Sequence, residues 1–111
     1  KPVIASNVDG IPEIIQDNNS GILIEPDQEL SINELTENSL LIPQFTINPK
    51  TQLLQKPKEL DPKKICKAIK YLALNKDIRN FYGNNLNKEV KKNFNIENYY
   101  KQMEDIYQSF D

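Results

Sequence analysis

A short polar turn near the start of the chain carries the residues best suited to chemistry. It follows an apolar run and precedes a helix start. Its candidate ligand-binding residues are Ser6, Asn7, Asp9, Gly10, Ile11 and Glu13. A glycine in such a turn lets a ligand come close to the backbone, and the unpaired N–H groups at a helix start suit an anion. Gly10 and Ile11 are predicted to provide these donors.

Gly10 and Glu13 also have purely structural interpretations. A tight strand-to-helix turn that needs a positive φ is enough to explain a glycine. An acid in the first helical turn stabilises a helix by about 0.3–1 kcal/mol, which is enough to explain Glu13. The sequence places no second carboxylate to share proton transfer with Glu13, so no catalytic residue is predicted.

Composition excludes several other kinds of site. The chain has no histidine and Cys66 is its only cysteine, so disulfides, ordinary zinc sites and histidine-dependent triads are excluded. No acidic pair is arranged like a metal site, and we expect neither a metal nor another cofactor. The 14 basic and 16 acidic residues form no basic stripe, so nucleic-acid binding is not expected. Cys66 lies at the edge of an apolar face and is predicted to be a core residue.

Residues 1–26 contain the elements that must position the turn. Pro2–Ser6 and Ile22–Ile24 are short apolar runs with the pattern of buried strands, and Ile11–Gln16 begins like a helix, with Pro12 and Glu13 in its first turn. Strand, helix, strand is the repeating unit of a parallel α/β sheet.

Residues 27–60 are predicted to be an insertion, because prolines interrupt them and no periodicity lasts a full turn. Two apolar patches, Leu40-Leu41-Ile42 and Leu53-Leu54, flank Phe45 and Ile47. Part of the insertion is therefore expected to form a hairpin or to pack onto the domain. An irregular surface excursion is the alternative.

Residues 61–111 are predicted to form three helices. The first begins with Asp61 as N-cap and ends near Asn75, the second begins near Asp77, and the third begins after Asn95. Apolar residues recur three and four positions apart on each, which predicts core-facing surfaces. They are Ile65, Ile69, Leu72 and Ala73, then Ile78, Phe81, Tyr82, Leu86, Val90 and Phe94, then Ile96, Tyr99, Tyr100, Met103, Ile106, Tyr107 and Phe110.

Three ordered blocks carry a resemblance to a known family. They are Lys1-Pro2-Val3-Ile4-Ala5-Ser6, Gly10-Ile11-Pro12-Glu13-Ile14-Ile15 and Asn19-Ser20-Gly21-Ile22-Leu23-Ile24-Glu25-Pro26-Asp27. With these blocks the chain resembles the C-terminal portion of group 1 (family 4) GT-B glycosyltransferases. The helical tail, with its Ile106-Tyr107 pair, fits the same pattern. The resemblance covers all of the chain except the insertion.

The resemblance implies a fold and a place in a larger enzyme. The fold class is α/β, a partial Rossmann-like parallel sheet of two short strands with a connecting helix, followed by the insertion and three C-terminal helices. In the family, the signature glutamates, the basic residues that bind the donor diphosphate and the acceptor-binding lobe all precede the first block. We therefore expect a C-terminal fragment of the nucleotide-sugar-binding lobe. Asp9-Gly10 departs from the two glycines that the family commonly has there, and the long insertion departs from its short connection.

The resemblance also implies a function. The parent enzyme would transfer a sugar from a nucleotide-sugar donor, such as a UDP- or GDP-sugar, to an unknown glycan, lipid or small-molecule acceptor in cell-envelope glycan biosynthesis, with retention of configuration. The fragment alone, without the missing N-terminal lobe, is expected to be inactive. A cytoplasmic location is expected because no run approaches the ~18 apolar residues of a membrane span. Within the cytoplasm, the protein is expected to be peripheral at the inner face of the membrane.

Two alternatives stay open. One is a non-catalytic nucleotide-sugar-binding module that uses the same α/β unit. The other is an interaction module that uses the aromatic stripe from Tyr99 to Phe110.

Overall fold

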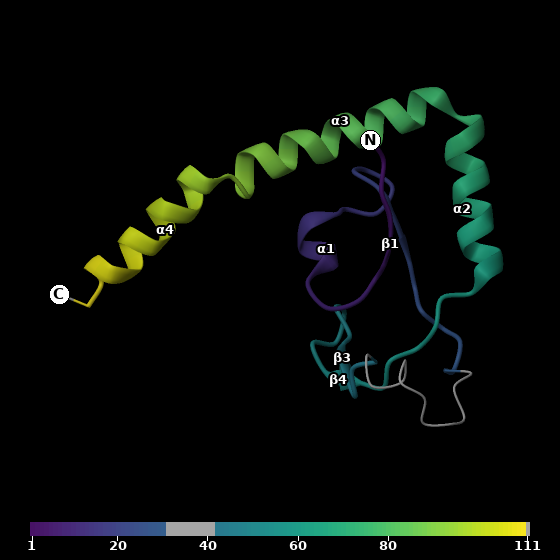
Figure 1. Ribbon diagram of the computed structural model, residues 1–111, viewed down its shortest axis with the longest axis horizontal. Coiled ribbons are helices and arrows are strands. Elements are labelled where there is room, and N and C mark those ends of the chain that lie inside the picture. Colours follow the sequence, from purple (N-terminus) through teal and green to yellow (C-terminus); the bar gives the residue numbers. More distant parts are fainter. Residues whose placement is uncertain (31–41, 111) are drawn as a thin grey trace.

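Two short parallel strands form the centre of the N-terminal unit. The computed structural model, which describes residues 1–30 and 42–110, pairs β1 (Ile4–Ser6) with β2 (Ile22–Ile24) in parallel, with Ile4 opposite Ile22. Helix α1 (Ile11–Ile14) connects the two strands (Figure 1). The predicted strand–helix–strand order and the parallel sheet are both confirmed.

Helix α1 is shorter than the predicted Ile11–Gln16 because a tight turn follows it. The backbone at Ile15 is extended, and the Gln16 N–H donates to Ser20 Oγ at 2.8 Å. Ser20 is fully buried and its own N–H donates to the Gln16 carbonyl at 2.9 Å. These two bonds close the turn that leads the chain into β2.

Close backbone approach explains two glycines of the fold. A Cβ at Gly21 would lie 2.7 Å from the Val3 carbonyl oxygen and 2.8 Å from Ile15 Cγ2. A Cβ at Gly83 would lie 3.1 Å from the Lys1 nitrogen. Real Cβ atoms essentially never show the contacts found at Gly21, and the contact at Gly83 is tighter than most. Glycine at these positions therefore lets β2 and α3 pack against the first residues of the chain.

Three helices follow the insertion, as predicted: α2 (Pro62–Leu74), α3 (Lys76–Asn93) and α4 (Ile96–Gln108). The predicted starts are correct to within one residue. The Asp61 side chain caps α2 by accepting from the Lys63 N–H, and the Asn95 side chain caps α4 by accepting from the Asn98 N–H. Arg79 Nη1 donates to the carbonyls of Leu72 and Ala73, each at 2.7 Å, which satisfies the C-terminal end of α2.

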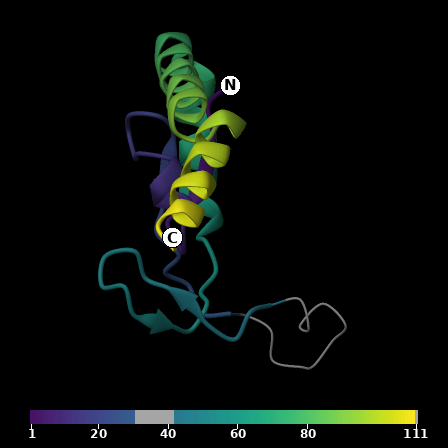
Figure 2. The same ribbon diagram turned by 90° about the vertical axis from the view of Figure 1, so that its left-hand side faces the viewer.

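The core lies between the small sheet and the first two long helices. Helix α2 packs against both strands and α3 packs against α1 and α2. Figure 1 shows α2 running alongside the strands, α3 crossing above them, and α4 leading away from the sheet, and Figure 2 shows the same helices from the side. The buried apolar side chains among the described residues are Ile15, Ile24, Ala68, Leu72 and Tyr82.

The predicted core role of the apolar stripes is wrong for α4 and for part of α3. No residue of α4 is buried, and Phe81 and Val90 of α3, together with Phe94 that follows it, are each at least 40% exposed. The reason is length: eighteen helical residues span about 27 Å, whereas two neighbouring strands lie only ~5 Å apart. The second half of α3 and all of α4 therefore extend beyond the sheet (Figure 1).

Three residues of α2 also differ from their predicted positions. Cys66 and Ala73 are exposed rather than part of the core, and Ile69 is 54% exposed. Ala68 and Leu72, four residues apart, form the face that meets the sheet. The sheet covers only this narrow strip, so Cys66 and Ile69 lie outside it.

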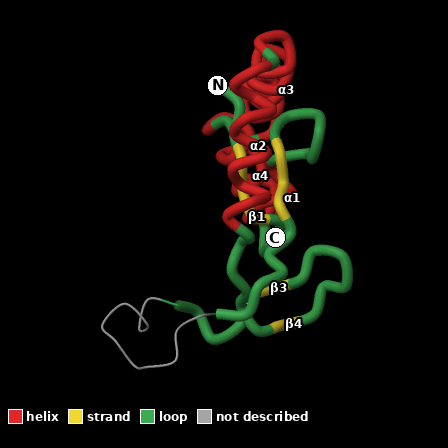
Figure 3. Tube along the Cα trace, turned by 90° about the vertical axis from the view of Figure 1, so that its right-hand side faces the viewer, coloured by secondary structure: helices red, strands yellow, loops and turns green. Residues whose placement is uncertain are grey.

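The insertion contains the expected hairpin. Strand β3 (Thr46–Ile47) pairs antiparallel with β4 (Leu54–Gln55), and Gln28 bridges to Glu59 in both directions. Figure 3 shows this hairpin below the helices and the parallel strands. An ion pair between Asp27 and Lys64 joins the insertion to α2. The hydrogen bond from Lys64, followed by that from Gln28, lowers the pKa of Asp27. The Leu40-Leu41 part of the predicted apolar patch lies outside the described residues.

Candidate functional site

The turn after β1 is bound to the end of β2. The Asn7 N–H donates to the Ile24 carbonyl at 2.9 Å, and Asn7 Nδ2 donates to Glu25 Oε2 at 3.0 Å. Asn7 Oδ1 is buried and has no hydrogen-bond partner within the described ranges. Ser6 pairs with Ile24 in the strand register. Ser6 and Asn7 thus hold the turn at the carboxyl end of β1.

Asp9, and not Gly10, adopts the left-handed backbone conformation. The φ angle of Asp9 is 51°, whereas that of Gly10 is −86°. Aspartate tolerates this region better than most residues because its short polar side chain bonds locally. The structural interpretation of Gly10 as a positive-φ residue is therefore wrong.

The predicted anion site at the start of α1 is not supported. The Ile11 N–H already donates to the Val8 carbonyl at 3.2 Å, and the Glu13 N–H donates to the Gly10 carbonyl at 3.1 Å. Helix α1 has only four residues, too few to add up to a substantial dipole. Ile11 is consequently unsuited to donate to a ligand.

The insertion docks on this same turn. The Asp9 N–H donates to the Ile47 carbonyl at 3.0 Å, and the Ile47 N–H donates to Asp9 Oδ1 at 2.7 Å. Residues 38 positions apart are thereby joined by a pair of hydrogen bonds. In Figure 1 the hairpin lies next to the carboxyl end of β1, where the turn begins.

A hollow of about 230 Å³ lies between the turn and the hairpin. It is lined by Asp9, Gly10, Pro12, Glu13, Ile47, Pro49 and Gln52. The structure therefore brings Asp9, Gly10 and Glu13 to one surface, while the predicted residues Ser6, Asn7 and Ile11 do not line it.

Sequence reasoning missed the contribution of the hairpin to this surface. The signal for the hairpin itself was present, because Asn48-Pro49 separates two short apolar runs. No pattern indicated that Ile47 would pair with Asp9, since that contact depends on tertiary docking. Pro49 and Gln52 therefore could not be assigned to the same site as Glu13.

The hollow has an acidic and neutral lining. Asp9 and Glu13 are its ionisable residues, and Gln52 adds an amide. Pro12, Pro49 and Ile47 provide apolar contact. Carboxylate and amide oxygens accept hydrogen bonds from hydroxyl groups, so this surface suits a neutral hydroxylated group better than a phosphate.

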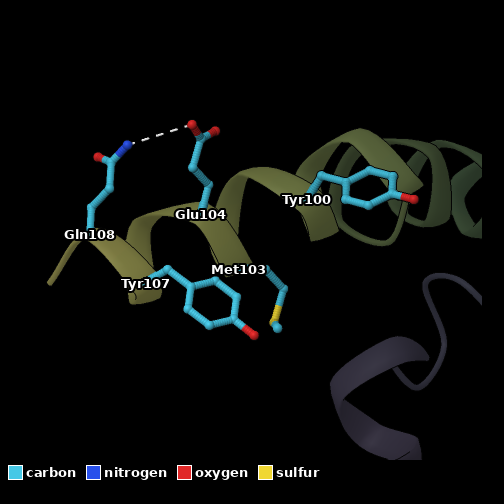
Figure 4. Close-up of a pocket in the computed structure, with 5 residues that line it drawn as sticks. All are labelled: Tyr100, Met103, Glu104, Tyr107 and Gln108. Atoms are coloured by element: carbon cyan, nitrogen blue, oxygen red, sulfur yellow. Dashed lines mark hydrogen bonds between the residues drawn. The ribbon is translucent and has the colours of Figure 1, made fainter. Parts of the chain in front are cut away.

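Larger hollows lie away from this turn. One, about 620 Å³, runs along one flank of α4. Figure 4 shows that all its lining side chains come from that single helix, with Gln108 Nε2 donating to Glu104 Oε1 at 3.5 Å. Another, about 350 Å³, lies where β2 meets Lys64, Lys67 and Tyr71 of α2. We favour the smaller hollow beside Asp9 as the candidate site, because it lies at the turn after β1 and ligands of open α/β sheets bind beyond the carboxyl ends of the strands.

In the part of the chain that the structure describes, no three His, Cys, Asp or Glu residues gather as a metal site would require. Within those same residues, no helix has both the length and the apolar character needed to cross a membrane. Comparisons of the chain with models of protein families, with curated proteins and with solved structures gave no match.

Proposed function

We propose that this chain forms part of the donor-binding lobe of a retaining glycosyltransferase with a GT-B, Rossmann-like fold. The observation that carries the proposal is the parallel β1–α1–β2 unit, whose turn opens a hollow beside Asp9, Gly10 and Glu13. Ligands of open α/β sheets bind beyond the carboxyl ends of the strands, which is where this turn lies. The three sequence blocks that resemble the family cover the same unit.

The proposed role is binding of the donor and not catalysis. Asp9 is engaged by the hairpin, and Glu13 is the other carboxylate of the hollow. General acid–base chemistry on a glycosidic bond commonly uses two positioned carboxylates. We therefore assign the chemical step, the diphosphate contacts and the acceptor to parts of the enzyme outside these residues, with the reaction in the cytoplasm at the membrane surface.

Donor hydrolysis tests the proposal. The intact protein that contains this chain is incubated with UDP-glucose, UDP-N-acetylglucosamine or GDP-mannose, and release of the nucleoside diphosphate is measured. We expect release from at least one donor, with the freed sugar keeping its anomeric configuration by NMR, and no release by residues 1–111 alone. Failure of the intact protein to bind or hydrolyse any nucleotide sugar would contradict the proposal.

A second candidate function is an interaction module, favoured by the exposed apolar face of α4. Tyr99, Tyr107 and Phe110 are 59%, 69% and 82% exposed. Exposed apolar patches of this kind mark surfaces that associate. A chain that stays monomeric at high concentration in analytical ultracentrifugation would count against this function.

A further inference from the structure

Two walls from distant parts of the sequence enclose the hollow beside Asp9. Gly10 and Glu13 belong to the first wall, and Pro49 and Gln52 of the hairpin loop belong to the second. The paired hydrogen bonds between Asp9 and Ile47 hold the walls together. The volume of about 230 Å³ is below the ~300–1,000 Å³ of sites for drug-sized ligands. The hollow therefore fits a single ring better than a whole nucleotide sugar.

The hairpin wall is held in one shape by its own hydrogen bonds. The Asn48 N–H donates to the Leu53 carbonyl at 2.9 Å, and the Gln52 N–H donates to the Asn48 carbonyl at 2.8 Å. Gln52 Nε2 donates to the Pro49 carbonyl at 2.8 Å, which orients the amide. This bond uses one of the two amide hydrogens and leaves Oε1 as an acceptor for a ligand.

Gln52 adopts a backbone conformation that is unfavourable for its residue type. Its φ angle is 59°, a region that glycine occupies without cost and glutamine seldom adopts. Glycine would therefore suit the loop better if only its shape mattered. Glycine would lack the side chain that bonds the Pro49 carbonyl and lines the hollow.

Gly10, in contrast to Gln52, is a glycine at a position whose backbone conformation does not require one. Its φ angle of −86° is open to any residue, and the nearest atom to an added Cβ is Glu13 Oε2 at 3.8 Å, an ordinary contact. Gly21 and Gly83, by contrast, are required by close backbone contacts. Its position before α1 gives Gly10 a modest capping preference. The space that it leaves open is on the wall of the hollow, where a ligand can come close to the backbone.

The charges of the hollow select among ligand classes. Asp9 and Glu13 repel phosphate, and no lysine or arginine lines the surface. Carboxylates and an amide accept hydrogen bonds from sugar hydroxyls, while Pro12 and Pro49 offer apolar faces to the C–H groups of a ring. A neutral sugar ring thus satisfies both the polar and the apolar lining.

We propose that this hollow binds the sugar ring of the donor, and that Gln52 and Pro49 of the insertion form the wall that selects the sugar. The inference rests on the proposed function and adds to it a role for residues outside the α/β unit. The sugar of the donor then binds in this hollow, and its nucleoside diphosphate binds to parts of the enzyme outside these residues.

Calorimetric titration of the intact protein tests this separation. The probes are UDP-glucose, UDP, GDP-mannose and GDP, and the variants are Gln52→Gly and Gly10→Leu. Gln52→Gly removes the side chain and relieves the backbone, and Gly10→Leu fills space beside Glu13. We expect the Kd of the nucleotide sugar that binds to rise about fivefold in Gln52→Gly, as for one lost hydrogen bond. A rise of more than about tenfold is expected in Gly10→Leu, from overpacking, while the Kd of UDP or GDP stays the same in both.

Lys50→Ala is the matched control, because Lys50 is exposed in the same loop and does not line the hollow. It should leave every Kd unchanged. Normal nucleotide-sugar binding by both test variants would overturn the inference and leave the proposed function intact. Equal weakening of UDP or GDP binding would overturn the inference too, since the wall would then not act on the sugar. Absence of binding of all four probes by the unaltered protein would overturn the proposed function, and this inference with it.

Discussion

Helices α2 and α4 are both thirteen residues long and have a strongly apolar face, yet they are used differently. Helix α2 buries Ala68 and Leu72 against the sheet, whereas α4 buries no residue. An apolar stripe thus predicts which face of a helix can be buried, but it does not predict which element of the protein will cover that face. Helix α2 lies within reach of β1 and β2, whereas α4 lies beyond the sheet.

The largest expected effect tests the buried side of this comparison. Leu72→Ala should lower the free energy of unfolding by about 3 kcal/mol, because Leu72 is 6% exposed and its removal leaves a cavity. Leu74→Ala on the same helix is the control, since Leu74 is 73% exposed and its loss should cost no more than about 0.5 kcal/mol. Urea denaturation measures both. Similar losses in the two variants would show that α2 does not pack as described.

The hydrogen bonds between Asp9 and Ile47 should stabilise a part of the chain that has few buried apolar side chains. Asp9→Ala should cost about 1–2 kcal/mol, because it removes the acceptor for the Ile47 N–H and places alanine at a φ of 51°. Asp9→Asn, which keeps an acceptor and tolerates this backbone, should stay close to the unaltered protein. Loss of the hairpin contact would appear as faster hydrogen exchange at the Ile47 amide in Asp9→Ala alone.

A third prediction uses pH to distinguish the packed region from the extended one. Burial, and to a lesser degree the neighbouring Tyr71, raises the pKa of Tyr82 above its usual value. A raised folded-state pKa contributes stability that is complete below the unfolded value of about 10 and is lost as pH rises through the folded value.

Tyr82→Phe should therefore show a weaker decline of unfolding free energy above about pH 10 than the unaltered chain. Tyr107→Phe, on exposed α4, is the control and should follow the unaltered chain. Parallel pH profiles for all three proteins would argue against a buried Tyr82 hydroxyl. The comparison is made between variants, so contributions common to all three proteins cancel.

The smallest expected effect concerns α4. Ile106→Ser with Tyr107→Ser should change the unfolding free energy by less than about 0.5 kcal/mol, because both side chains are more than half exposed. The same variant should associate less than the unaltered chain in sedimentation velocity, since it removes exposed apolar surface. A stability loss comparable to that of Leu72→Ala would mean that α4 packs onto the domain.

Local signals predicted most of the secondary structure. Asp61 caps its helix as expected, α4 begins directly after Asn95 as expected, and the turn residues from Asp17 to Gly21 separate α1 from β2. These features depend on neighbours in the sequence. The burial of Cys66 and of the α4 stripe was predicted wrongly, because burial depends on how much sheet is present to cover a helix.

The candidate site was predicted only in part for a similar reason. Asp9, Gly10 and Glu13 lie on one short segment, so their proximity follows from the turn. Gln52 reaches the same hollow only because Ile47 docks on Asp9. This is a tertiary contact, and the spacing of apolar residues in the sequence does not predict it. The exchange of roles between Asp9 and Gly10 was missed because either residue type can occupy a left-handed position.

The close approach of Gly83 to Lys1 bears on how the chain folds during synthesis. Lys1 can reach its packed position beside Gly83 only when α3 is available. At about 5–20 residues per second, a ribosome needs roughly 4–16 s to add the residues that separate these two positions. During that interval Lys1 has no α3 to pack against, so the contact between Lys1 and Gly83 forms late in synthesis.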